Sequence, residues 1–130
     1  MNETITENEY YDIHIDRNKN RCYMTFRGFW KDLSLVPNIK KDLTSYPKIL
    51  DPSFTTLLDL RDFKTPGPEV MDMFVEVQKE NAQYEYKKAA RVVTQPLEKL
   101  AADRVGKAAE IQDKTAFFNT LEEAEKWLDE

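Results

Sequence analysis

The sequence predicts an α/β fold, in which a mixed, mostly parallel sheet of four to five strands packs against about four helices in the order ββαβαβαβα. Three observations predict it. Two segments near the N-terminus alternate between apolar and polar residues, as half-buried strands do. The apolar run 54–60 ends in charged residues and a Pro and Gly cluster, which is typical of a buried parallel strand that leads into a helix. Strand and helix patterns then alternate to the C-terminus, which favours right-handed crossovers.

The first two strands are predicted to form a hairpin. Residues 10–16 and 21–27 each place apolar side chains on one face and polar ones on the other, and residues 17–20 contain two Asn that suit a tight turn. The polar, acidic segment 1–9 is expected to be a flexible tail. Residues 10–130 are then expected to form a single domain.

Apolar residues spaced three and four apart predict the helices, which begin near Val36, Pro68, Gln95 and Leu121. Leu97 and Leu100 are expected on the inner face of the third helix. The last helix has a capping box, in which the Thr120 hydroxyl accepts from the Glu123 amide. Strands at 88–93 and 114–118 separate the later helices.

The composition argues against several classes of protein. With 24 acidic and 19 basic residues the net charge is −5, which disfavours binding to nucleic acid or to anionic membranes. The single cysteine, Cys22, cannot form an internal disulfide, and with one His it cannot build a usual zinc site. We expect no cofactor. The sequence has no apolar run long enough to predict stable membrane insertion. The N-terminus lacks the features of a signal peptide, so a cytoplasmic protein is expected.

Charged residues mark the end of the buried strand. Asp59 and Asp62 flank Arg61, and two interpretations are open: an acid–base pair at a ligand site, or loop carboxylates with structural roles. Arg91 lies between apolar residues in a predicted central strand, where a cation needs a partner. We expect a structural ion pair between Arg91 and a carboxylate such as Asp59 or Asp62, with Asp59 as the first candidate.

The loop that follows predicts a binding surface. Thr65 precedes the helix that begins at Pro68, so it is a candidate phosphorylation site next to the positive end of the helix dipole, or an ordinary cap residue. Two aromatic residues after Gly28 could line a docking patch or cover the core. The candidate residues for binding a partner or ligand are Phe29, Trp30, Arg61, Asp62, Thr65, Gly67 and Glu69.

Several segments together resemble the SpoIIAA-like domains of the STAS (anti-sigma-factor antagonist) superfamily, bacterial proteins that are distantly similar to lipid-binding CRAL-TRIO domains. The segments are 11–16 (Tyr-Asp-Ile-His-Ile-Asp), 18–20, 23–29, 57–63 (Leu-Leu-Asp-Leu-Arg-Asp-Phe), 90–93 and 118–124. The resemblance implies a compact STAS-like sheet without catalytic residues. It also implies docking on a partner kinase, switched by phosphorylation of a loop serine. Here that loop reads Lys64-Thr65-Pro66-Gly67, which has no serine.

These observations predict a non-enzymatic regulatory domain that binds a partner protein through the loop 61–69 and the following helix. The alternative is a carrier or sensor of a small ligand of apolar character, as the CRAL-TRIO similarity implies. An enzyme that uses Asp59 and Asp62 is the third hypothesis. The sequence leaves homodimerisation open.

Overall fold

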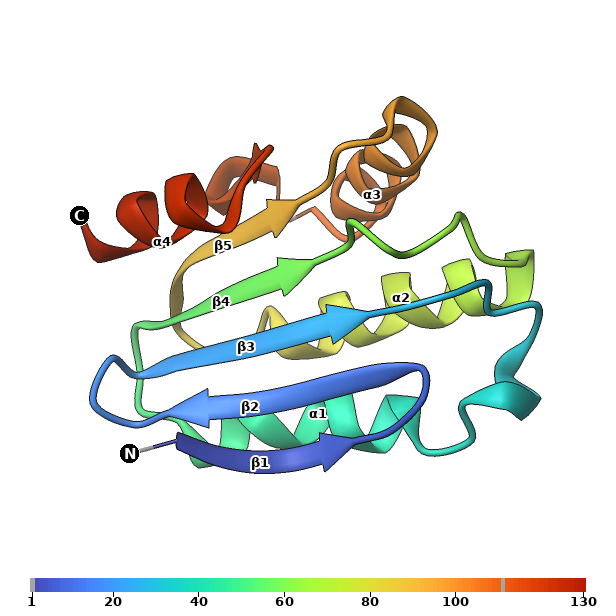
Figure 1. Ribbon diagram of the computed structural model, residues 1–130. Coiled ribbons are helices and arrows are strands. Elements are labelled where there is room, and N and C mark those ends of the chain that lie inside the picture. The colour runs from blue at the N-terminus through green and yellow to red at the C-terminus, as the bar shows by residue number, and fades with distance from the viewer. Residues whose placement is uncertain (1, 111) are drawn as a thin grey trace.

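The computed structural model describes residues 2–110 and 112–130 (Figure 1). The elements in order are β1 (Asn2–Glu7), β2 (Tyr11–Asp16), β3 (Arg21–Phe26), the 3-10 turn η1 (Leu33–Leu35), α1 (Ile39–Ile49), β4 (Phe54–Asp59), α2 (Pro68–Asn81), β5 (Tyr86–Val92), α3 (Pro96–Ala108), η2 (Gln112–Lys114), β6 (Thr115–Phe118) and α4 (Leu121–Asp129).

The strands form one mixed sheet in the order β1-β2-β3-β4-β5-β6. The pairs β1–β2 and β2–β3 are antiparallel, whereas the pairs β3–β4, β4–β5 and β5–β6 are parallel. The predicted fold class is confirmed, because each helix α1, α2 and α3 connects two neighbouring parallel strands. The sheet has six strands across the described residues instead of the expected four to five.

The extra strand is β1, so the expectation of a flexible tail over residues 1–9 is wrong for residues 2–7. This segment pairs antiparallel with β2, and Glu3 forms an ion pair with Arg17. Thr4, Ile5 and Thr6 are β-branched and suit a strand, and Ile5 packs against the core. The acidic, polar residues that suggested a tail belong to an edge strand, where hydrophilic side chains face solvent.

Helices cover both faces of the sheet (Figure 1). The main core lies between one face and α1, α2 and α3, and it includes Ile13, Ile15, Met24, Phe26 and the buried Cys22. A smaller apolar cluster forms on the other face beneath α4, from Leu57, Ala90, Val92, Ala124 and Leu128. Among the described helices, none is long and apolar enough to cross a membrane.

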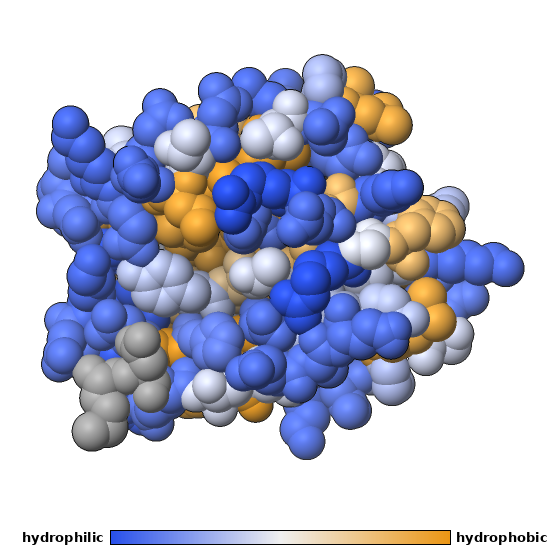
Figure 2. Space-filling model, in the orientation of Figure 1, coloured by the Kyte–Doolittle hydropathy of each residue, from blue (hydrophilic) through white to orange (hydrophobic). Residues whose placement is uncertain are grey.

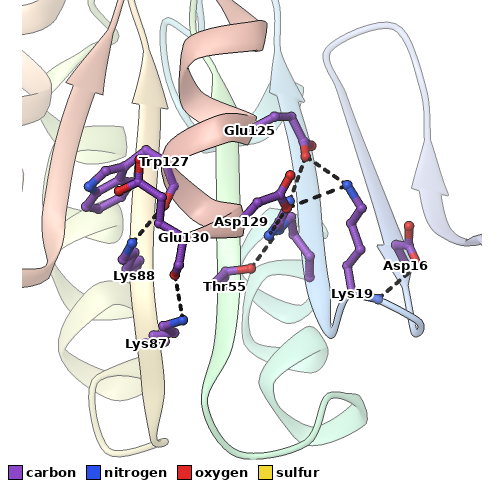
Figure 3. Close-up of polar contacts among 10 residues, drawn as sticks. Asp16, Lys19, Thr55, Lys87, Lys88, Glu125, Trp127, Asp129 and Glu130 are labelled. Atoms are coloured by element: carbon purple, nitrogen blue, oxygen red, sulfur yellow. Dashed lines mark hydrogen bonds and ion pairs between the residues drawn. The ribbon is translucent and has the colours of Figure 1, made fainter.

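Polar contacts attach α4 to its face of the sheet (Figure 3). Arg21 of β3 has a side chain that is only 4% exposed, and its Nη1 and Nη2 atoms lie 2.6 Å from Glu125 and 3.0 Å from Asp129 of α4. Its Nε donates to Thr55 Oγ1 at 2.8 Å. The part of this face over β1–β3 carries mainly hydrophilic residues (Figure 2). This face therefore presents no extended apolar surface there.

Candidate functional site

The two segments expected to form a binding surface lie side by side beyond the ends of β3 and β4. The Gly28 amide donates to the Asp62 carbonyl (3.0 Å), and the Lys64 amide donates back to the Gly28 carbonyl (3.0 Å). The Gly67 amide donates to the Trp30 carbonyl (3.1 Å). These bonds continue the parallel pairing of β3 with β4, so the loop 61–69 is held by the segment 28–33.

Of the two aromatic residues after Gly28, only one is at the surface. Trp30 is 0% exposed, and its indole N–H donates to the Arg27 carbonyl at 2.9 Å. Its ring lies 4.8–5.8 Å, between centroids, from the rings of Tyr11, Phe26, Phe63 and Phe74. The assignment of Trp30 to a binding surface is therefore wrong in this conformation. Phe29 points outward and is 51% exposed.

Gly67 and Glu69 fasten the start of α2. A Cβ at Gly67 would lie 2.1 Å from the Lys31 carbonyl oxygen, so only glycine allows the two segments to approach this closely. A Glu69 carboxylate oxygen accepts from the Leu33 amide at 2.9 Å. The geometry gives both residues structural roles.

Asp59 is paired with Arg61 instead of Arg91. The Arg61 guanidinium makes two bonds to the Asp59 carboxylate, of 2.9 and 2.8 Å, and the Arg61 amide makes a third of 3.1 Å. Partial burial raises the pKa of Asp59, but the bonds from Arg61 outweigh it and hold that pKa below its usual value. A carboxylate that stays ionised in this way is a poor proton donor.

The expected ion pair between Asp59 and Arg91 is wrong because the two residues project from opposite faces of the sheet. In the parallel register, Asp59 lies opposite Val92, and Leu58 lies opposite Arg91. Successive side chains of a strand alternate between faces. Val92 packs in the cluster beneath α4, whereas Leu58 packs in the main core, so Arg91 enters the core on the side of α1–α3.

A cavity of about 100 Å³ lies on that side, between the sheet and the helices. Its floor comes from β3, β4 and β5, and α2 and α3 form its main walls. Most of the lining is apolar. The polar and charged residues of the lining include Thr65, Gln78, Asn81, Arg91 and Glu98, and α3 contributes the apolar residues Ala101, Ala102 and Val105. Neither Asp59 nor Asp62 lines it, so the geometry does not support an acid–base site at those residues.

Polar atoms without partners converge on this cavity. Among the described residues, four buried side-chain atoms have no hydrogen-bond partner: Thr65 Oγ1, Gln78 Oε1, Asn81 Oδ1 and Arg91 Nη1. All four residues line the cavity. Buried polar groups in folded proteins are almost always paired, so a cluster of unpaired ones in a hollow is typical of a binding site.

The position of the Thr65 hydroxyl bears on the expected phosphorylation site. The oxygen exposes less than 1 Å² and belongs to the cavity wall. The Thr65 amide donates to a Glu98 carboxylate oxygen of α3 at 3.3 Å. A kinase cannot reach this hydroxyl in the present conformation, so the geometry argues against Thr65 as a phosphorylation site.

Arg91 is the charged residue at the centre of the site. It is 8% exposed, and no ion pair to it is present among residues 2–110 and 112–130. Burial lowers the pKa of the guanidinium, and the nearby phenol groups of Tyr46 and Tyr86 partly offset this. The Arg91 charge thus lies in an apolar setting, and no carboxylate in the described part of the chain pairs with it.

Two features of the sequence could have indicated this site. Gln78 and Asn81 interrupt the inner apolar stripe of α2, which otherwise carries Val70, Met73, Phe74 and Val77. The inner face of α3 carries the small residues Ala101 and Ala102. Small residues on the inner face of α3 leave space between the two helices. The side-chain oxygens of Gln78 and Asn81 on the inner face of α2 then have no hydrogen-bond partner across that space within the described residues.

Comparisons with known proteins support the fold. No family model matches the chain, and no curated protein matches it. A solved structure, an uncharacterised protein of the DUF3478 family from Shewanella loihica PV-4, is described as having a SpoIIAA-like fold. It superposes with a TM-score of 0.65 over 95% of this chain and 97% of its own, at 16% sequence identity. At this identity the similarity concerns the fold alone. The chain has a SpoIIAA-like fold, as the resemblance in its sequence predicted.

Proposed function

We propose that this chain is a non-enzymatic, STAS-like domain that binds a small, mainly apolar molecule in the cavity between its sheet and helices α2 and α3, as a carrier or sensor. The observation that carries the proposal is the convergence of four unpaired buried polar atoms on one apolar cavity. Apolar walls supply affinity through burial, and a few polar groups supply orientation.

The size of the cavity limits the ligand. In liquid water each molecule occupies about 30 Å³, and an engineered apolar cavity of about 150 Å³ binds benzene. A volume of about 100 Å³ therefore suits a molecule of a few carbon atoms plus a polar group. A long lipid needs a larger space than this conformation provides.

The walls of the cavity differ in how firmly they are held. Within α3, the buried residues are Val105 and Gly106, whereas Leu97 and Leu100 are exposed. A helix with so little buried surface can be displaced at low cost, which offers a route of entry. Thr65 and Pro66 connect the cavity to the loop 61–69, so an occupied cavity would contact the surface loop as a sensor requires.

The proposal is tested with a cavity-filling variant. A panel of small neutral and acidic molecules, including 1-propanol, 1-butanol and butyrate, is titrated into ¹⁵N-labelled protein and followed by NMR. We expect shifts at cavity residues that disappear in Ala102→Leu, because leucine fills the space between α3 and the sheet. The matched control is Ala108→Leu, an exposed position on the same helix. Absence of saturable binding by any member of the panel would refute the proposal.

A second candidate function is binding of a partner protein at the loop 61–69. It is favoured by the hydrogen bonds that hold this loop rigidly while Phe29, Arg61 and Asp62 remain exposed. To test this, the wild type, Phe29→Ala, Arg61→Ala and the control Lys126→Ala on α4 are each immobilised and incubated with a native lysate. The proteins that each variant retains are then compared. We expect one protein that is retained by the wild type and the control but lost with both loop variants. Equal retention by all four would reject this surface.

A further inference from the structure

We infer that the ligand carries a carboxylate and that Arg91 binds it, with the apolar part of the ligand lying between α2, α3 and the sheet. This inference rests on the proposed function, because it names the chemistry of the molecule in the same cavity. The volume of about 100 Å³ restricts this ligand to a monoanionic aliphatic carboxylic acid of about three to five carbons.

Arg91 is a buried part of the site, and the structure gives it no charged partner within the described residues. It is a residue of the central strand β5, more than nine-tenths buried, and its Nη1 atom lacks a hydrogen-bond partner. A buried charge is stabilised only by an opposite charge and hydrogen bonds. A guanidinium binds a carboxylate through two parallel N–H···O bonds, which makes a carboxylate the best-matched group.

The carboxylates nearest to the cavity already have partners other than Arg91. Glu98 lines the cavity and accepts from the Thr65 amide. Asp103 borders a second hollow of about 30 Å³ that also touches Arg91, and it pairs with Lys107 at 3.0 Å. Neither lies within 4 Å of a side-chain nitrogen of Arg91, since no such ion pair occurs among the described residues. The protein thus supplies the cation and leaves the position of the anion open.

The charges of the cavity lining favour a ligand with a single negative charge. Among residues 2–110 and 112–130, Arg91 is the one cationic residue that lines the cavity, and Glu98 brings a negative charge to the same lining. A phosphate dianion would leave excess negative charge in an apolar space, which is costly. A single carboxylate matches the one positive charge of Arg91 and leaves uncompensated only the charge of Glu98, which the Thr65 amide already binds. The unpaired oxygens of Gln78 and Asn81 can accept from a hydroxyl or from water beside it.

The experiment compares acids with neutral molecules of the same shape. Butyrate and isobutyrate are titrated at pH 7 against 1-butanol and isobutanol, into wild type, Arg91→Met and Arg104→Met. Arg104 is an exposed arginine of α3, so its variant controls for the change in net charge. We expect Arg91→Met to weaken binding of the acids at least about thirtyfold and to change binding of the alcohols little. The control is expected to behave like the wild type.

A second measurement needs no variant. The side-chain ¹⁵N–¹H resonances of Arg91 should move on addition of butyrate and stay unchanged with 1-butanol. If acids and alcohols bind with equal affinity, or if the Arg91 resonances do not respond to the acid, the carboxylate inference is refuted while the proposed function stands. If neither acids nor alcohols bind the wild type, both fail. Retained binding of alcohols by Arg91→Met also shows that the variant is folded.

Discussion

Replacing Arg91 with methionine is expected to raise the free energy of unfolding by about 1–3 kcal/mol in the absence of ligand. The reason is that the Arg91 charge is buried without an opposite charge among the described residues, so the folded state carries a desolvation cost that the unfolded state avoids. Methionine keeps a similar length and adapts to irregular apolar space. Urea denaturation of both proteins at pH 7, followed by circular dichroism, measures the difference.

The matched control is Arg21→Met, because Arg21 is equally buried in a central strand but is paired. Its guanidinium contacts Glu125, Asp129 and Thr55, and its loss leaves these groups without their partner. We expect Arg21→Met to lower the free energy of unfolding by about 1–3 kcal/mol, less than for a fully buried pair because both carboxylates are partly exposed. A similar loss in both variants would show that Arg91 is already satisfied in the free protein.

A gain of stability in Arg91→Met, together with loss of carboxylate binding, would have a clear meaning. Functional sites are commonly maintained at the expense of stability, because groups that await a ligand are unpaired in the free protein. The same residue would then destabilise the empty domain and hold the ligand in the occupied one. Butyrate should accordingly stabilise the wild type against urea and stabilise Arg91→Met much less at the same concentration.

Trp30→Ala is expected to lower the free energy of unfolding by about 3–5 kcal/mol, the largest effect of a single substitution that we anticipate. Trp30 is fully buried where the loop after β3 meets the core, and four aromatic rings surround it. The substitution removes these contacts and leaves a cavity beneath the loops 28–33 and 61–69. Thermal and urea denaturation measure the effect.

The neighbouring residue provides the control for Trp30. Phe29 is half exposed, so Phe29→Ala is expected to change stability by no more than about 0.5 kcal/mol. The pair separates a core role from a surface role at adjacent positions. If Trp30→Ala were as mild as Phe29→Ala, the indole would not be part of the core and its assignment to the binding surface would be reinstated.

Much of the fold was predictable because local signals and burial agree. The alternation in residues 10–16 and 21–27 corresponds to β2 and β3, and the apolar run 54–60 corresponds to the buried strand β4. Pro68 begins α2, and the Thr120 hydroxyl accepts from the Glu123 amide at the start of α4. These features depend on a few neighbouring residues, so the sequence alone indicates them.

Two elements differ from the expectation where the deciding interactions are not local. The segment 2–7 is a strand because β2 offers a free edge, which the composition of the segment does not reveal. In α3, Leu97 and Leu100 were expected inside but face outward. The inner face carries Glu98, Ala101, Ala102 and Val105 instead, and this choice of face leaves the cavity open.

The amino-acid sequence by itself determined the class of fold, the succession of most elements, and the presence of a cation in a central strand that requires an explanation. Only the tertiary structure decided which anion that cation can meet. The register of β4 against β5 sends the Asp59 side chain to the face of α4 and the Arg91 side chain to the face of α2 and α3. The physical reason is that strand residues alternate between faces, so a carboxylate one position out of phase lies across the sheet from the arginine, and the arginine is left facing a cavity.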